Sequence, residues 1–172
     1  MKKDFIDFLL ELHKKEDRGS LAKLRRGVGK PPGESMEVYS VIGRFIAEAK
    51  SELEEYALYL VATLYGLYPS ESAEKYNFGA SFAQLRLRQE SESTERRFVA
   101  ILNSNFEDLP QHLRQAVNLL KSKEVHINWL QLLNDILDWQ RDDYKVQRQW
   151  ATSFWKEIET EETRQAEKTE EI

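Results

Sequence analysis

The stretch SELEEYALYLVATLYGLYP, residues 51–69, decides the fold class of this chain. After its first turn, apolar side chains fall on most sides of the expected helix, and Pro69 ends it. A helix that is apolar nearly all round belongs in the interior of a protein. We therefore predict that this segment forms the most buried helix of the N-terminal half.

Apolar residues at spacings of three and four predict amphipathic helices on both sides of this segment. The first covers residues 5–12, and a short second one begins with Ser20 as its N-cap and ends at the glycines and prolines of residues 27–33. A third is predicted within residues 34–49. Further helices are predicted in SFAQLRLRQ (81–89), SESTERRFVAILNSN (91–105), DLPQHLRQAVNLLKSK (108–123), INWLQLLNDILDWQR (127–141) and a last segment through Tyr144, Trp150 and Trp155.

No run of alternating apolar and polar residues predicts a strand, and no repeat of solenoid length is present. The predicted fold is all-α, with two packed helical bundles and about eight or nine helices. Residues 1–90 form the N-terminal helical half, residues 91–160 form the C-terminal bundle, and the polar stretch at 88–94 is the expected hinge. The acidic residues 161–172 are predicted to be disordered.

The charge of the chain is unevenly distributed. The formal net charge is −5, but residues 156–172 contain seven Glu against three basic residues and account for −4 of it. The body is therefore nearly neutral, and its cations can gather on one face. The chain has no cysteine, and its apolar N-terminal run is interrupted by Asp7 and Glu11, so no signal peptide or membrane span is expected. We expect a cytoplasmic protein.

The residues that enzymes use are not grouped in the sequence. His13, His112 and His126 stand in none of the helical spacings that direct two ligands to one metal, and no phosphate-binding loop or nucleophile motif is present. Asp135 and Asp138 share a helix face, but without a partner histidine or glutamate on that helix they favour a solvated, salt-bridged surface over a metal site. We predict no catalytic residue, no metal and no cofactor.

Basic residues form the stronger pattern. Arginine predominates among them, and its planar guanidinium can bind phosphate through two hydrogen bonds or stack on a base. A stripe of such cations would suffice to bind a nucleic-acid backbone without reading its sequence. The alternative is that each arginine pairs with one of the abundant carboxylates. The candidate nucleic-acid-binding residues are Lys23, Arg25, Arg26, Arg86, Arg88, Arg96, Arg97, Arg114 and Arg141.

The four tryptophans are open to two interpretations. They could form a platform on which bases stack, but at helical spacing among leucines they are more typical of a hydrophobic core. They are Trp129, Trp139, Trp150 and Trp155.

Several stretches together resemble the CasB family, the small subunit of the type I-E CRISPR surveillance complex known as Cascade. Each is weak alone, whereas the ordered set is specific and covers most of the chain. The stretches are RGSLAKLRRG (18–27), FGASFAQLRL (78–87), ESTERRFVAILNSN (92–105), LPQHLRQAVNLLKSKEVHINWLQLLNDILDW (109–139) and VQRQWATSFW (146–155).

The resemblance implies a non-catalytic, all-helical subunit in which the whole chain is one family domain. Its implied partners are the repeated backbone subunit, the large subunit, a second copy of itself, the guide RNA and the displaced single-stranded non-target DNA, which it would help to hold while the guide is paired. The implied contact residues are Arg25, Arg26, Arg96, Arg97 and Arg114, with Arg141 as a looser match. Gln115 stands where some members have a further basic residue.

Two other classes of protein remain as alternatives. One is a helical adaptor that binds only proteins and whose arginines are paired with acids. The other is a helix-turn-helix regulator, which the short SLAKLRRG segment supports poorly because it runs directly into Gly and Pro.

Overall fold

The computed structural model describes residues 1–89 and 91–170 of the chain. Within these ranges it contains nine helices and no strand, apart from an isolated bridge between Ser72 and Ile127, so the predicted all-α class is confirmed. The helices are α1 (Lys2–Lys14), α2 (Arg18–Arg26), α3 (Met36–Ala47), α4 (Glu52–Leu67), α5 (Phe78–Gln89), α6 (Glu92–Leu102), α7 (Leu109–Ser122), α8 (Trp129–Asp138) and α9 (Lys145–Glu170).

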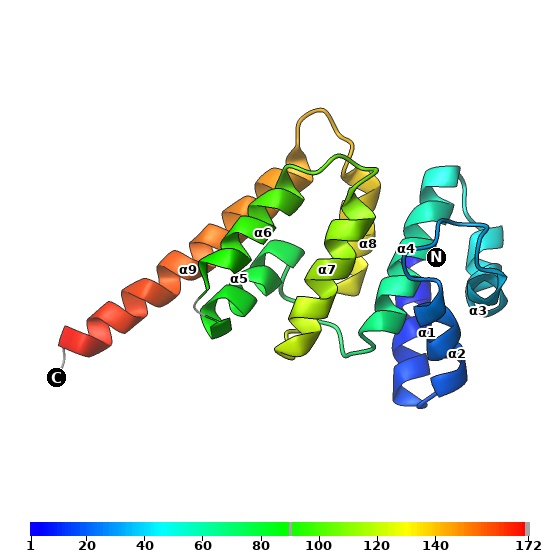
Figure 1. The fold of residues 1–172 in the computed structure, drawn as a ribbon, viewed down its shortest axis with the longest axis horizontal. Helices are drawn as coiled ribbons and strands as arrows, with labels where there is room; N and C mark the ends of the chain where they lie inside the picture. The colour runs from blue at the N-terminus through cyan, green and yellow to red at the C-terminus, as the bar shows by residue number, and fades with distance from the viewer. Residues whose placement is uncertain (90, 171–172) are drawn as a thin grey trace.

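Helix α4 lies between the two groups of helices, as Figure 1 shows. Ser51 caps it by accepting a hydrogen bond from the Glu54 backbone N–H, and all ten residues from Ala57 to Gly66 are buried. On one side α4 packs against α2 and α3, and on the other it packs against α7 and α8. The prediction that it is the most buried helix of the N-terminal half is confirmed.

Helices α5 to α9 form the second group. Helix α5 packs mainly along α9, where the Phe78 and Trp150 rings lie 4.8 Å apart and Gly79 lies directly against the Trp150 backbone. The sequence placed α5 in the N-terminal half, but its apolar face is covered by a helix that begins more than fifty residues later. The chain therefore passes from the first group of helices to the second in the segment between α4 and α5. Residue 90 of the expected hinge lies outside the described residues.

Helix α9 corrects the prediction of a disordered tail from residue 161. The helix continues to Glu170 and projects from the body at the end marked C in Figure 1. Glu, Gln, Lys and Arg are good helix formers, and pairs such as Arg164 with Glu161, 3.7 Å apart, support the exposed turns.

Two helix starts also differ from the prediction. Asp17, rather than Ser20, caps α2 by accepting a hydrogen bond from the Ser20 N–H at 3.0 Å, and α5 begins at Phe78, three residues before Ser81. Asp17 was the better candidate because its carboxylate reaches two donors of Ser20, the backbone N–H and the hydroxyl. Among the described helices none is both long enough and apolar enough to cross a membrane.

Candidate nucleic-acid interface

The end of α2 is positioned by a glycine on α4. A Cβ at Gly66 would lie 2.6 Å from the Arg25 backbone nitrogen and 2.7 Å from the Leu24 Cβ, so only glycine allows the two helices to approach this closely. Leu24 is fully buried in this contact, whereas the Arg25 side chain is exposed. Burial of Leu24 thus holds Arg25 at the surface beside the last turn of α4.

Helix α7 brings two further cations to the same place. The Lys121 Nζ donates a hydrogen bond to the carbonyl of Leu67, at the end of α4, over 3.1 Å. Arg114 lies two helical turns earlier on the same face of α7. Its Nη1 is 3.0 Å from the point where a side chain at Gly29 would begin, so it lies against the loop that carries Lys30.

Helix α6 contributes Arg97. This side chain lines a small hollow of about 100 Å³ together with His112, Gln115 and Leu119 of α7. Phe98, the next residue on α6, is fully buried, which fixes the direction in which Arg97 leaves the helix. Arg96 is exposed but lies outside the residues that line this hollow.

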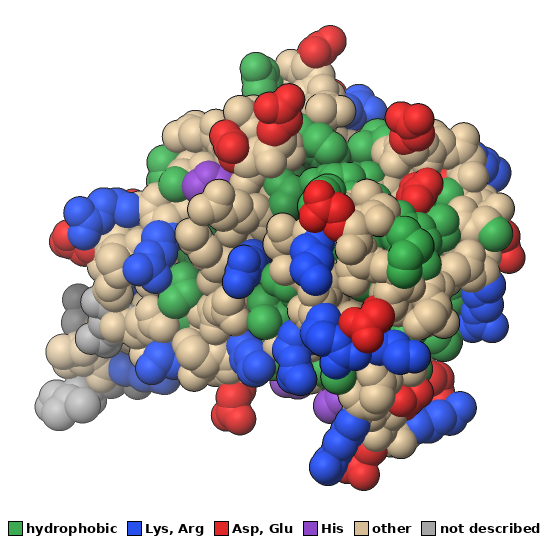
Figure 2. Space-filling view, turned by 45° about the vertical axis from the view of Figure 1, so that its right-hand side comes forward, with side chains coloured by type: hydrophobic (Ala, Val, Ile, Leu, Met, Phe, Trp, Pro, Cys, Tyr) green, Lys and Arg blue, Asp and Glu red, His purple; other side chains and the backbone are tan. Residues whose placement is uncertain are grey.

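These five side chains make up what we call the cationic band: Arg25, Lys30, Arg97, Arg114 and Lys121. All five are exposed, and in the part of the chain that the structure describes none forms a salt bridge with a carboxylate. Figure 2 shows Lys and Arg side chains gathered across the lower middle of one face, with apolar side chains exposed above them. Exposed cations without acidic partners are the arrangement that attracts a polyanion.

Arg26, next to Arg25 on α2, is paired with an acid, whereas Lys23 on the same helix is half-buried and has no salt bridge among the described residues. Arg26 donates two hydrogen bonds to Glu37, at 2.7 and 2.9 Å. That interaction, with smaller contributions from the charges of Lys23 and Lys30, lowers the pKa of the Glu37 carboxyl. Arg26 is therefore largely neutralised in the structure, whereas Arg25 is not.

The two arginines of α5 differ from each other. Arg88 is exposed and donates a hydrogen bond to the carbonyl of Lys123, just after α7, so it lies near the Lys121 end of the cationic band. Arg86 is half-buried, and its Nε is buried without a hydrogen-bond partner among the described residues.

Arg141 is not brought to the band. It lies in the turn between α8 and α9 and pairs with Asp143 at 3.0 and 3.2 Å, which lowers the pKa of the Asp143 carboxyl. Its neighbour Trp139 donates to the Ser104 carbonyl, before α7 begins, so Arg141 and Lys121 lie at opposite ends of α7. The structure therefore does not bring Arg141 together with the cations of the band.

Lys30 and Lys121 were absent from the predicted set. Lys30 was visible in the sequence as part of the cluster that follows α2. Lys121 stands seven residues after Arg114, a spacing that indicates a shared helix face. That spacing was the signal in the sequence from which Lys121 could have been added to the candidate residues.

The tryptophans are mainly structural, as the sequence favoured. Trp129, Trp139 and Trp150 are at most 3% exposed, which rules them out as an open stacking platform. Trp155 differs, because 41% of it is exposed on α9.

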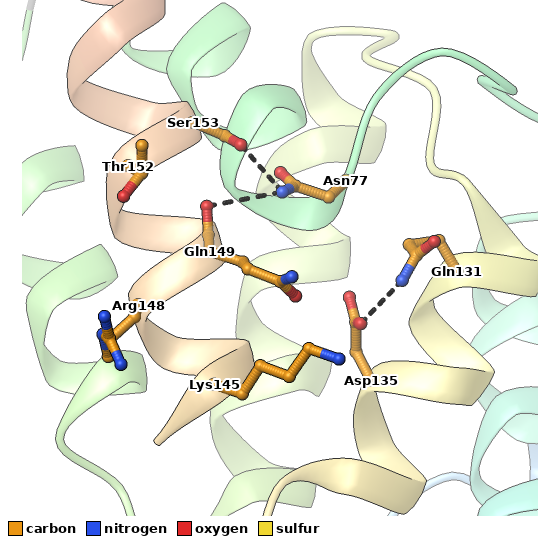
Figure 3. A pocket seen from close by; sticks show the side chains of 8 residues that line it. All are labelled: Asn77, Gln131, Asp135, Lys145, Arg148, Gln149, Thr152 and Ser153. Carbon is orange, nitrogen blue, oxygen red and sulfur yellow. Dashed lines mark hydrogen bonds between the residues drawn. The ribbon is translucent and has the colours of Figure 1, made fainter. Parts of the chain in front are cut away.

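Asp135 was predicted to lie on a solvated surface, but it is buried. It lies in the wall of a polar hollow of about 550 Å³ between α8, α9 and Asn77 (Figure 3). Its Oδ2 accepts from Trp150 Nε1 at 2.7 Å and its Oδ1 accepts from Gln131 Nε2 at 2.8 Å. Burial raises the pKa of this carboxyl.

The surroundings of Asp135 indicate a structural role. The Lys145 side chain extends toward it in Figure 3, and no group of three or more metal-binding side chains occurs in the ranges that the structure describes. Both oxygens of Asp135 accept hydrogen bonds, and the one from the buried Trp150 links α8 to α9.

The described residues form an all-helical protein that carries a cationic band on its surface. A family model described as CRISPR-associated protein Cse2 matches residues 20–155. A curated relative from Thermus thermophilus, the CRISPR-associated protein Cse2, is 32% identical over 167 residues, which are 95% of each chain. The chain therefore belongs to the CRISPR-associated Cse2 family, in agreement with the resemblance found in the sequence.

Solved structures agree with this assignment. The M. ruber CasB structure is 33% identical, with a TM-score of 0.77 over 94% of this chain and 96% of that chain. A chain in the structure of a CRISPR RNA-guided surveillance complex is 29% identical, with a TM-score of 0.82 over 96% of both chains. The similarity thus extends over nearly the whole fold.

Proposed function

We propose that this chain is the non-catalytic small subunit of a CRISPR RNA-guided surveillance complex of the Cascade type. In this role it binds the sugar–phosphate backbone of the guide RNA and of the displaced non-target strand, and thereby stabilises the R-loop. Its protein partners are the repeated backbone subunit, the large subunit and a second copy of itself. The family assignment and the similarity to a chain of such a complex support this proposal.

The observation that carries the nucleic-acid role is the cationic band. It gathers cations from α2, α6, α7 and the loop after α2 that form no salt bridge among the described residues, and contacts from such cations to phosphates do not depend on the base sequence. Backbone contacts of this kind suit a strand whose sequence differs at every target. The exchange of a DNA duplex for a guide–target duplex is nearly balanced in free energy, so modest contacts to the displaced strand can shift it.

The direct test measures binding of a fluorescently labelled single-stranded oligonucleotide by anisotropy over a series of salt concentrations. We expect affinity to fall as salt rises, because each neutralised phosphate releases about 0.7 of a counterion in a single strand. The double variant R97A/R114A should weaken binding and reduce the log–log salt slope by about 1.4.

The matched control is R141A/R164A, which removes the same charge from two arginines that are paired with acids outside the band. It should retain the affinity and slope of the unmodified chain. Equal losses in both double variants would mean that total charge matters rather than the band. In an assembled complex, unchanged R-loop retention by R97A/R114A would contradict the proposed role.

A further inference from the structure

A second hollow adjoins the cationic band. It has a volume of about 340 Å³ and lies between the loop of residues 28–32, helix α4 and the start of α7. Arg114 and Lys30, two members of the band, line it. A strand that follows the band, as the proposed function requires, therefore passes the mouth of this hollow.

Proline and tyrosine side chains form a large part of the lining of the hollow. Pro31, Pro32 and Pro110 contribute rings from the loop and from α7, and Tyr56 and Tyr59 contribute aromatic rings from α4. Tyr56 is held by Phe106, whose ring centre lies 5.4 Å away at an angle of 48°. Aromatic and proline rings around a space near the lower end of the roughly 300–1,000 Å³ typical of small-ligand sites suit a planar ring.

The polar groups of the hollow favour an uncharged ring over a phosphate. Glu107 and Gln111 line it as well, and both are exposed. The Glu107 carboxylate would repel a phosphate inside the hollow, but it can accept hydrogen bonds from the amino group of a base. Phosphates would then stay on Arg114 and Lys30 while a base turns inward.

We propose that this hollow holds one unstacked nucleobase of a strand bound along the cationic band, with Tyr56 as the stacking residue. The inference rests on the proposed function and names a base-binding site within it. Any base can stack on an aromatic ring, so such a site adds affinity without selecting a sequence.

The test compares two oligonucleotides of equal length and charge, one with natural bases and one in which every base is replaced by an abasic tetrahydrofuran residue. The abasic strand should bind about five-fold or more weakly, because base–aromatic stacking is worth at least about 1 kcal/mol. The salt slopes of the two strands should be equal, since their phosphates are the same.

Tyr56→Ala should abolish the preference for the strand with bases and leave binding of the abasic strand unchanged. Tyr56→Phe keeps the aromatic ring and should therefore keep the preference for the strand with bases. It is the variant to measure if Tyr56→Ala fails to fold. Tyr144→Ala is the matched control, because Tyr144 is 65% exposed and lies away from the hollow. It should keep the preference too.

Other results would overturn the inference. Equal binding of the two strands would exclude a base site but leave the proposed function intact, whereas no binding of either strand would contradict both. A preference that survives Tyr56→Ala would place the base elsewhere. If Tyr56→Ala affects neither strand but releases the chain from the assembled complex, the hollow holds a side chain of a partner protein instead.

Discussion

Asp135 on α8 joins α9 through its hydrogen bond with Trp150. Replacing it by Ala would leave the Trp150 N–H, 2.7 Å from its present acceptor, buried without a hydrogen bond. We expect Asp135→Ala to lower the free energy of unfolding by about 1–3 kcal/mol, measured by urea denaturation. Asp135→Asn retains an acceptor oxygen and should cost less. Equal stability of the alanine variant and the unmodified chain would contradict this role.

The same carboxyl predicts a pH dependence of stability. Burial raises its pKa above the ordinary 3.8, so the folded state holds the proton more tightly than the unfolded state. The contribution of Asp135 to stability is therefore greatest at or below pH 3.8 and declines as the pH rises through the raised pKa. In urea titrations from acidic to neutral pH, Asp135→Asn should lose this component of the pH dependence. If the free energy of unfolding of Asp135→Asn varied with pH as that of the unmodified chain does, this role of Asp135 in the pH dependence would be contradicted.

At the scale of elements, the packing of α5 on α9 depends on Gly79. A methyl group there would meet the Trp150 carbonyl oxygen, which belongs to the backbone of α9 and cannot move aside alone. We expect Gly79→Ala to destabilise the chain by about 1–3 kcal/mol in thermal or urea unfolding.

Gly43→Ala in α3 is the matched control for this prediction. A Cβ at Gly43 meets no atom within 4 Å, so the substitution should be neutral or stabilise the chain by up to about 1 kcal/mol through helix propensity. If both variants unfold at the same denaturant concentration, close approach of α5 and α9 is not what requires glycine at position 79.

For the whole molecule, the projecting end of α9 predicts an electrostatic effect. Residues 162–172 carry four acidic and two basic side chains, and 162–169 are exposed. Deleting 162–172 should change the free energy of unfolding by less than about 0.5 kcal/mol, because surface residues contribute little. It should also speed association with single strands at low salt by removing negative charge.

Stopped-flow association at two salt concentrations measures this effect. Salt screens interactions between exposed charges beyond about 8–10 Å, so the gain in rate should shrink as salt rises. A gain that is independent of salt would show that the tail acts by blocking the surface instead of by its charge.

Helices were predictable from the sequence because their signals are local. The apolar run of α4 and the spacing of Phe5, Leu9 and Leu12 depend only on neighbours within a few turns. Phe5, Leu9, Leu12 and residues Ala57 to Gly66 of α4 are all buried. Burial of Asp135 had no local signal, since its partner Trp150 lies fifteen residues away on another helix. The partner of α5 was hidden for the same reason.

The sequence by itself determined the all-α class, the order of its helices and the family. Only the tertiary structure decided which cations share a face. Arg25, Arg97 and Arg114 stand on helices that pack together, α2 on α4, and α6 and α4 on α7, whereas Arg26 and Arg141 are paired with Glu37 and Asp143. Helix periodicity arises within a few turns of chain, but the meeting of surface charges depends on contacts between distant segments.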